Sequence, residues 1–346
     1  MVVSRLIGGM FGLPRVVGAL RPSLPEFLSG PSAFTANARS ALGIVCRQIV
    51  PRFIWLPSYL CEVILRAVEW AKCPYQFYPT NGTLGVDDFE WIKSVSEEDA
   101  VLLIDYFGFP QTDEVVNRCR ETGAVVIEDA CQALLSDCVG THADYTVYSP
   151  RKWVGVPDGG ILKVAEHSQI PEMTLTPPDE EWWLTGLEAS IQRRQSDDYC
   201  GEDREWFSLF QKHDREDVTG PFSMSDLSKS LLRRCFDYEE IAARRRDNYS
   251  ILYESLSEYS LTGVLPTGVV PLGFPIRTSR RDDLRQAMFA EQIYPPVHWD
   301  LDGVVPESFT ASHQLSREIM TLPCDQRYGE ADMQRLVSVI RSWEKT

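Results

Sequence analysis

A carboxylate and a lysine stand at the ends of two short apolar segments near the middle of the chain. Asp129 follows the apolar run 124–127, and Lys152 follows a second run, 145–148. Both runs are typical of buried strands in a parallel sheet. Ligand sites in open α/β sheets lie outside the carboxyl ends of the strands. We therefore expect Asp129 and Lys152 to face one pocket.

These two side chains suit a particular kind of carbonyl chemistry. A buried lysine with a lowered pKa can attack a carbonyl carbon and form a Schiff base. A buried carboxylate can keep a ring nitrogen protonated, so that the ring accepts electrons, as pyridoxal 5'-phosphate (PLP) requires. Taken alone, the pair leaves a second interpretation open, in which Asp129 caps a helix and Lys152 is a solvated loop charge.

Three motifs surround this pair. They are EDACQAL at 128–134, YSPRK at 148–152 and PDGG at 157–160. Together they resemble the DegT/DnrJ/EryC1/StrS family of PLP-dependent sugar aminotransferases, which have the α/β fold of aspartate aminotransferase (fold type I). The resemblance implies that Lys152 binds PLP as a Schiff base and that Asp129 pairs with the pyridine nitrogen. It also implies that Gln132 lies near the hydroxyl of the cofactor.

A helix that begins near Asn37 is a candidate for the phosphate end of the cofactor site. Small residues at a helix start let a phosphate approach the free backbone N–H groups, and the helix dipole favours the negative charge. The resemblance assigns this role to the turn formed by Asn37, Ala38, Arg39 and Ser40. Arg39 could pair with the phosphate directly. An ordinary polar helix cap is an equally good interpretation of Asn37 alone.

The chain departs from the family pattern at several positions. The family's phosphate-binding Ser usually lies five positions before the lysine, where this chain has Val147, and Ser149 lies three before it. Ser149 is therefore our candidate for that contact. Ala38 stands where Gly is usual, Asp105 where His is usual, and Ser223 where the family commonly has Asn. We expect these departures to affect the phosphate site or the substrate class.

Aromatic residues supply the remaining candidates. The resemblance places a side chain near Tyr59 over one face of the cofactor ring, with Tyr59 as the candidate and Cys61 as the alternative. A tyrosine at a strand end is also a common rim residue. His298 and Trp299 could contact substrate, although a lone His beside Trp is more often a structural hydrogen-bonding residue.

Composition limits the class of protein. The chain has 346 residues, 44% of them hydrophobic, and a formal net charge of −16. This charge disfavours nucleic acid and anionic membrane surfaces as partners, and no apolar stretch is long enough to span a bilayer. The nine cysteines show no spacing typical of zinc sites. We expect reduced thiols, no metal and a cytoplasmic protein.

The order of apolar and amphipathic segments predicts an α/β architecture with a mostly parallel sheet and a smaller C-terminal α/β domain. The resemblance implies that this sheet has seven strands. We expect a lead-in at 1–32, a large PLP-binding domain at 33–235, and an interdomain helix with a small domain at 236–346. The expected helices include 62–70, 113–121 and one long helix over 225–249. The polar region 165–220 is expected to hold one helix, at 187–194, and a mobile stretch at 195–205.

The resemblance implies an aminotransferase that transfers an amino group from an amino acid to a keto-sugar, nucleotide-linked, in surface polysaccharide or secondary-metabolite biosynthesis. Enzymes of this fold are homodimers with a shared site, so we expect a homodimer. Two alternatives stay open. One is PLP chemistry on another substrate, as in an amino-acid transaminase or a dehydratase; Lys152 argues against the dehydratase branch that carries His at this position. The other is a non-catalytic relative that binds or regulates.

Overall fold

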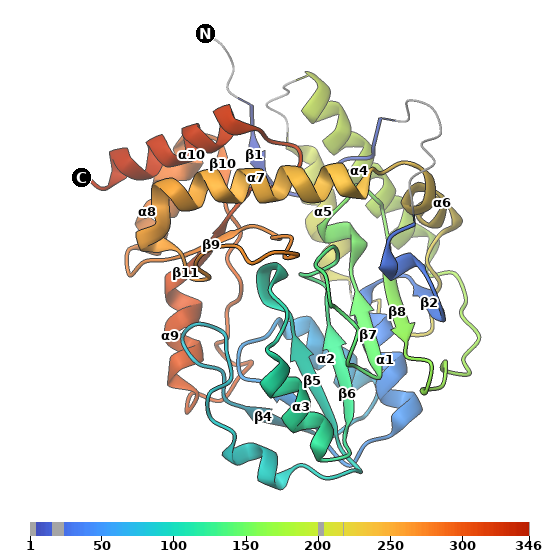
Figure 1. The fold of residues 1–346 in the computed structure, drawn as a ribbon. Helices are drawn as coiled ribbons and strands as arrows, with labels where there is room; N and C mark the ends of the chain where they lie inside the picture. Colours follow the sequence, from blue (N-terminus) through green and yellow to red (C-terminus); the bar gives the residue numbers. More distant parts are fainter. Residues whose placement is uncertain (1–4, 16–23, 200–203, 217, 346) are drawn as a thin grey trace.

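The computed structural model describes residues 5–15, 24–199, 204–216 and 218–345 (Figure 1). Within these residues a seven-stranded sheet has the order β2-β8-β7-β6-β5-β3-β4. The strands β4, β3, β5, β6 and β7, which are neighbours in this order, run parallel to one another. The strand β8 runs antiparallel to both of its neighbours. The predicted α/β fold with a mostly parallel sheet is confirmed. Its strands are β2 Ser32–Thr35, β3 Ile54–Pro57, β4 Tyr75–Tyr78, β5 Ala100–Ile104, β6 Val125–Asp129, β7 Tyr145–Tyr148 and β8 Gly160–Val164.

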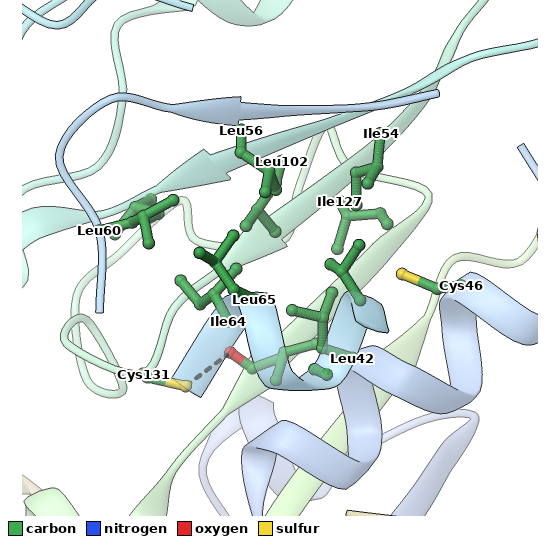
Figure 2. Close-up of a cluster of buried hydrophobic side chains, with 14 of the residues drawn as sticks. Leu42, Cys46, Ile54, Leu56, Leu60, Ile64, Leu65, Leu102, Ile127 and Cys131 are labelled. Carbon is green, nitrogen blue, oxygen red and sulfur yellow. Dashed lines mark hydrogen bonds between the residues drawn. The ribbon is translucent and has the colours of Figure 1, made fainter. Parts of the chain in front are cut away.

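Both faces of the sheet are covered, which explains why its central strands are apolar throughout. On one face, α1 (Ala38–Ile49) and α2 (Glu62–Trp70) pack on alternate strand residues, as Figure 2 shows for Leu42 and Ile64 against Leu102 and Ile127. The other face carries α3 (Asp113–Glu121). Because successive strand residues point to opposite faces, every residue of β5 is buried. This packing fixes the strand ends from which site residues project.

A second apolar cluster surrounds the C-terminal elements. The long helix α7 (Tyr238–Leu256) crosses above the sheet in Figure 1, next to α10 (Glu330–Trp343). The strands β9 (Phe274–Arg277) and β11 (Ile319–Leu322) pair antiparallel. Near the N-terminus, β1 pairs in parallel with β10. The bounds of these and the neighbouring elements are β1 Ile7–Gly8, α8 Arg281–Ala290, β10 Ile293–Tyr294 and α9 Thr310–Glu318. Short 3-10 helices occur elsewhere along the described chain, at Glu26–Leu28, Glu90–Ser94, Tyr106–Gly108, Pro150–Lys152 and Ser257–Tyr259.

Two sequence predictions about helices are wrong. The region 165–220 contains two helices, α4 (Glu180–Tyr199) and α5 (Glu205–Arg215), so part of the expected mobile stretch is helical, and residues 200–203 lie outside the described residues. The expected long helix over 225–249 is also divided, into α6 (Asp226–Arg234) and α7. The division has a local cause, because Asp237 has an extended backbone and its side chain accepts a hydrogen bond from the Glu240 N–H.

Two features of the described residues concern membrane-spanning helices and disulfide bonds. None of the described helices has the length and apolar character needed to cross a bilayer. The eight described cysteines form no disulfide bond.

Candidate active site

A pocket of about 880 Å³ opens at the carboxyl ends of β6 and β7. It brings together most of the side chains that the sequence singled out. Among its lining residues are Asn37, Ala38, Arg39, Asp129, Gln132, Ser149, Lys152, His298 and Trp299. Ser40 and Tyr59 are not among them.

Lys152 ends a short 3-10 turn that follows β7. The next residue, Trp153, is fully buried, and its indole N–H donates to the Cys131 carbonyl at 3.1 Å. This anchor fixes the backbone of the turn, and the Lys152 side chain extends into the open space of the pocket. The lysine is therefore held by a rigid support and still accessible to a ligand.

The pKa of Lys152 reflects opposing contributions. Burial, the largest of them, lowers this pKa, but Cys131, Asp129, Cys61 and Asp214 together raise it more, so that the net shift is upward. Burial raises the pKa of the Cys131 thiol well above its usual value. That thiol is neutral near pH 7, and the carboxyl groups of Asp129 and Asp214 also contribute to the upward shift of the Lys152 pKa.

Asp129 and Gln132 lie at the end of β6 and just beyond it. Asp129 accepts a hydrogen bond from the Cys131 N–H at 3.0 Å. Gln132 is 1% exposed, and its Oε1 accepts from the Phe107 N–H at 2.8 Å. Its Nε2 has no acceptor among the described residues. An unpaired buried amide is costly, and an oxygen of bound PLP would satisfy it, so this part of the site fits the cofactor.

The start of α1 has a structural role as well as facing the pocket. The Asn37 Oδ1 accepts from the Ser40 N–H at 2.8 Å, and its Nδ2 donates to the Val218 carbonyl at 2.7 Å. The Ser40 hydroxyl donates to the same carbonyl at 3.3 Å and accepts from the Gly220 N–H. Both side chains are thus used to hold the segment before α6. The groups of the predicted phosphate turn that line the pocket are Asn37, Ala38 and Arg39, and Ser149 joins them.

The PDGG motif explains how α1 reaches this position. A Cβ on Gly160 would lie 2.2 Å from the Asn37 carbonyl carbon, so only glycine permits this approach of β8 to the helix start. Gly159 has a φ of +139°, which L-residues rarely adopt. Asp158 is buried and accepts from the Ser225 N–H at 2.7 Å and from its hydroxyl at 2.6 Å. The motif therefore ties α1 and α6 to the pocket.

The ring-stacking candidate is placed differently from the expectation. Tyr59 is fully buried outside the pocket lining and packs against Trp299, with ring centroids 5.6 Å apart. Cys61, two residues further on, does line the pocket. The difference arises because the chain turns into α2 at this point, which directs Tyr59 into the core. Cys61 becomes the proposed neighbour of the cofactor ring.

His298 also lines the pocket, from the segment after β10. Its Nδ1 and the Thr321 hydroxyl are 2.9 Å apart, and its ring meets that of Phe107 at 5.5 Å. Burial, with a further contribution from Lys152, lowers the pKa of His298 to about 3. The imidazole is therefore neutral at physiological pH and does not compete with Lys152 for negative charge.

A buried pair of carboxyl groups stands behind Asp129. Asp105 is fully buried, and its Oδ1 accepts from the Gln111 N–H at 2.9 Å. Its Oδ2 has no N–H donor among the described residues and faces Glu128. Burial, followed by the charge of Glu128, raises the pKa of Asp105 well above its usual value, and burial also raises the pKa of Glu128. The pair therefore retains a proton to a higher pH than two isolated carboxyl groups would.

This arrangement predicts that Asp105→Asn becomes increasingly stabilising, relative to the wild type, as the pH rises from 5 to 8. A carboxyl group with a raised folded-state pKa keeps a proton that the unfolded chain releases above about pH 4, so stability declines by up to about 1.4 kcal/mol per pH unit. An asparagine supplies a permanent N–H for Glu128 and removes this decline. The free energy of unfolding in urea, measured at both pH values, tests the prediction. An equal difference at pH 5 and pH 8 would contradict the retained proton, and exposed Asp113→Asn is the control.

Several pocket residues were not identified from the sequence. The helix α5 contributes Phe207, Phe210, His213 and Asp214, and Asp214 lies 3.6 Å from Arg151 in an ion pair. The N-terminal segment 8–11 and Arg285 of α8 also line the pocket. The sequence offers no signal for these positions beyond the dense aromatic and charged composition of 180–215.

The comparisons with known proteins agree with this geometry. The model of the DegT/DnrJ/EryC1/StrS aminotransferase family matches residues 90–341. Among solved structures, DesV from S. venezuelae is 17% identical to this chain, with a TM-score of 0.67. The match covers 92% of this chain and 86% of the DesV chain. PseC from Helicobacter pylori, an aminotransferase involved in the biosynthesis of pseudoaminic acid, is 15% identical, with 93% and 89% covered and a TM-score of 0.67.

A third structure, that of DesI in the presence of its TDP-sugar product, is 16% identical, with 90% of this chain and 80% of that chain covered and a TM-score of 0.62. No curated protein matches the chain significantly. The family match covers well over half of the sequence and includes Asp129, Gln132 and Lys152. The chain therefore belongs to the DegT/DnrJ/EryC1/StrS family of PLP-dependent aminotransferases.

Proposed function

We propose that this enzyme transfers an amino group from an amino acid to a keto-sugar that is linked to a nucleotide. One observation carries the proposal: in a member of a sugar aminotransferase family, Lys152, Asp129 and the unpaired amide of Gln132 line a single pocket. Further support for the nucleotide comes from DesI, whose structure was determined in the presence of its TDP-sugar product.

PLP, when bound, supplies an electron sink that makes the proton on the adjacent carbon acidic. The protein residues around it have separate tasks. Lys152 would hold the cofactor aldehyde and would act as the general base that moves the proton at the α carbon of the amino donor. Asp129 would keep the ring nitrogen protonated. Ala38, Arg39 and Ser149 would hold the phosphate.

The proposal also includes the oligomeric state and the cellular location of the enzyme. We propose a homodimer with the site at its interface, in the cytoplasm, where reduced thiols persist. The free state of the described cysteines supports this compartment. We further propose that the chain is divided into a lead-in at 1–32, a large domain at 33–235 and a final unit at 236–346. The proposed role of the enzyme is in surface polysaccharide or secondary-metabolite biosynthesis.

A panel of UDP-, dTDP- and GDP-linked 4-keto-6-deoxyhexoses tests the substrate class. With PLP and L-glutamate present, we expect one nucleotide series to yield an amino-sugar that mass spectrometry detects, with formation of 2-oxoglutarate in equal amount. Simple amino-acid and keto-acid pairs serve as the comparison. Efficient transamination among these pairs, and none with the sugars, would contradict the proposal.

A further inference from the structure

The charge of the pocket is opposite to that of the whole protein. The chain has a formal net charge of −16. Within the described residues, seven cationic side chains line the pocket against three carboxylates. The cations are Arg39, Arg151, Lys152, Arg204, Arg245, Arg285 and Arg327, and the acids are Asp129, Asp214 and Asp325. A cleft with this balance concentrates anions from solution.

Most of these arginines have partners inside the protein. Arg151 pairs with Asp214 at 3.6 Å, and Arg327 pairs with Asp325 at 2.8 Å. Arg245 donates to the Gln326 side chain at 2.8 Å and to nearby backbone carbonyls. Arg39 likewise interacts with another group of the protein. These groups are occupied in holding the pocket walls.

Arg204 and Arg285 differ from the others because neither forms an ion pair in the part of the chain that the structure describes. Instead, both lie against aromatic rings. The Arg204 guanidinium lies 3.9 Å from the centroid of the Tyr294 ring, and Arg285 lies 4.8 Å from that of Phe289. The two rings contact each other with centroids 5.3 Å apart. The result is a continuous row with an arginine at each end.

This row leaves hydrogen-bond donors for a ligand. The Arg285 Nε donates to the Pro295 carbonyl at 3.3 Å, and no hydrogen bond is made by its two terminal nitrogens among the described residues. Burial and the neighbouring Arg281 lower the pKa of Arg285, so an added anion would stabilise this cation. Stacking holds a guanidinium in place, and its planar fork binds phosphate through two parallel hydrogen bonds.

We propose that Arg204 and Arg285 form the subsite that binds the diphosphate group of the nucleotide-linked substrate. The inference rests on the proposed function, because it identifies how the same pocket holds the non-reacting part of that substrate. It assigns the role to α5 and α8, two elements that lie outside the cofactor motifs. Binding energy from this remote anion would hold the sugar near Lys152.

Direct binding tests the subsite without turnover. Isothermal titration calorimetry of the PLP-loaded protein would compare UDP, dTDP and GDP with the uncharged nucleosides and with inorganic phosphate. We expect one nucleoside diphosphate to bind at least tenfold more tightly than its nucleoside. Arg204→Gln and Arg285→Gln should each weaken it about tenfold, the range of one charge-assisted contact. Arg118→Gln, which removes a surface ion pair on α3, should change nothing.

The other possible outcomes either overturn the inference or reject only the proposed function. Wild-type affinity in both variants would overturn it, and so would the absence of binding by every nucleoside diphosphate. Inorganic phosphate binding as tightly as the nucleotide would indicate a general anion site. A changed oligomeric state with unchanged affinity would assign the two arginines to a subunit contact. Failure of keto-sugar transamination, with arginine-dependent nucleotide binding intact, would instead reject the proposed function and leave this subsite.

Discussion

Lys152→Ala is expected to lower the rate of transamination by at least about 10⁴-fold, because the variant loses both the attachment of the cofactor and the general base. The pocket offers no second lysine among its lining residues in the described part of the chain. The visible absorption band of lysine-bound PLP should disappear in the same variant. Steady-state rates and an absorption spectrum of the PLP-loaded protein provide the two measurements.

The control for this variant is Lys93→Ala, which removes an exposed lysine that pairs with Glu90. It should retain the band and the rate. A Lys152→Ala protein that keeps its near-ultraviolet circular dichroism, its absorption band and more than a tenth of the rate would contradict the assignment. Loss of the band with retained folding would separate a chemical role of Lys152 from a structural one.

The second large effect is expected for Asp129. Asp129→Asn removes the negative charge that would keep the ring nitrogen protonated, while the side chain keeps its size. We expect the rate to fall about 10³-fold, which is the scale for loss of one electrostatic contact to a developing charge in an active site. The structure also predicts a lower pKa for Lys152 in this variant, because Asp129 contributes to its upward shift.

Both consequences can be measured on one protein. The pH dependence of the absorption band that follows addition of PLP reports the Lys152 amine, and the rate constants report catalysis. The exposed Asp113→Asn substitution, in the first turn of α3, is the matched control. An unchanged rate in Asp129→Asn would remove this residue from the chemistry and leave it the role of accepting from the Cys131 N–H.

The elements that build the sheet could be predicted because their patterns are local. The helices at 62–70 and 113–121 have the predicted bounds. Each is set by an amphipathic or continuous apolar period that the sequence shows directly. That Asp129 and Lys152 line one pocket followed from the same reasoning, because Asp129 ends β6 and Lys152 follows the neighbouring strand β7.

The parts that were not predicted depend on contacts between distant residues. Whether Tyr59 or Cys61 faces the pocket depends on the turn into α2, which no sequence period fixes. The contribution of α5 could not be foreseen, since the same polar and aromatic composition is typical of a surface segment. Arg204 and Arg285 stand far apart in the chain, and only the packing around Tyr294 and Phe289 brings them together.

The central claim is that one amine, the Nζ of Lys152, carries the cofactor. Borohydride reduction of the PLP-loaded protein makes that linkage permanent, and peptide mass spectrometry then locates it. We expect a phosphopyridoxyl group on the peptide that contains Lys152 and on no other. A label on a different lysine, or a protein that takes up PLP without forming any reducible linkage, would contradict it.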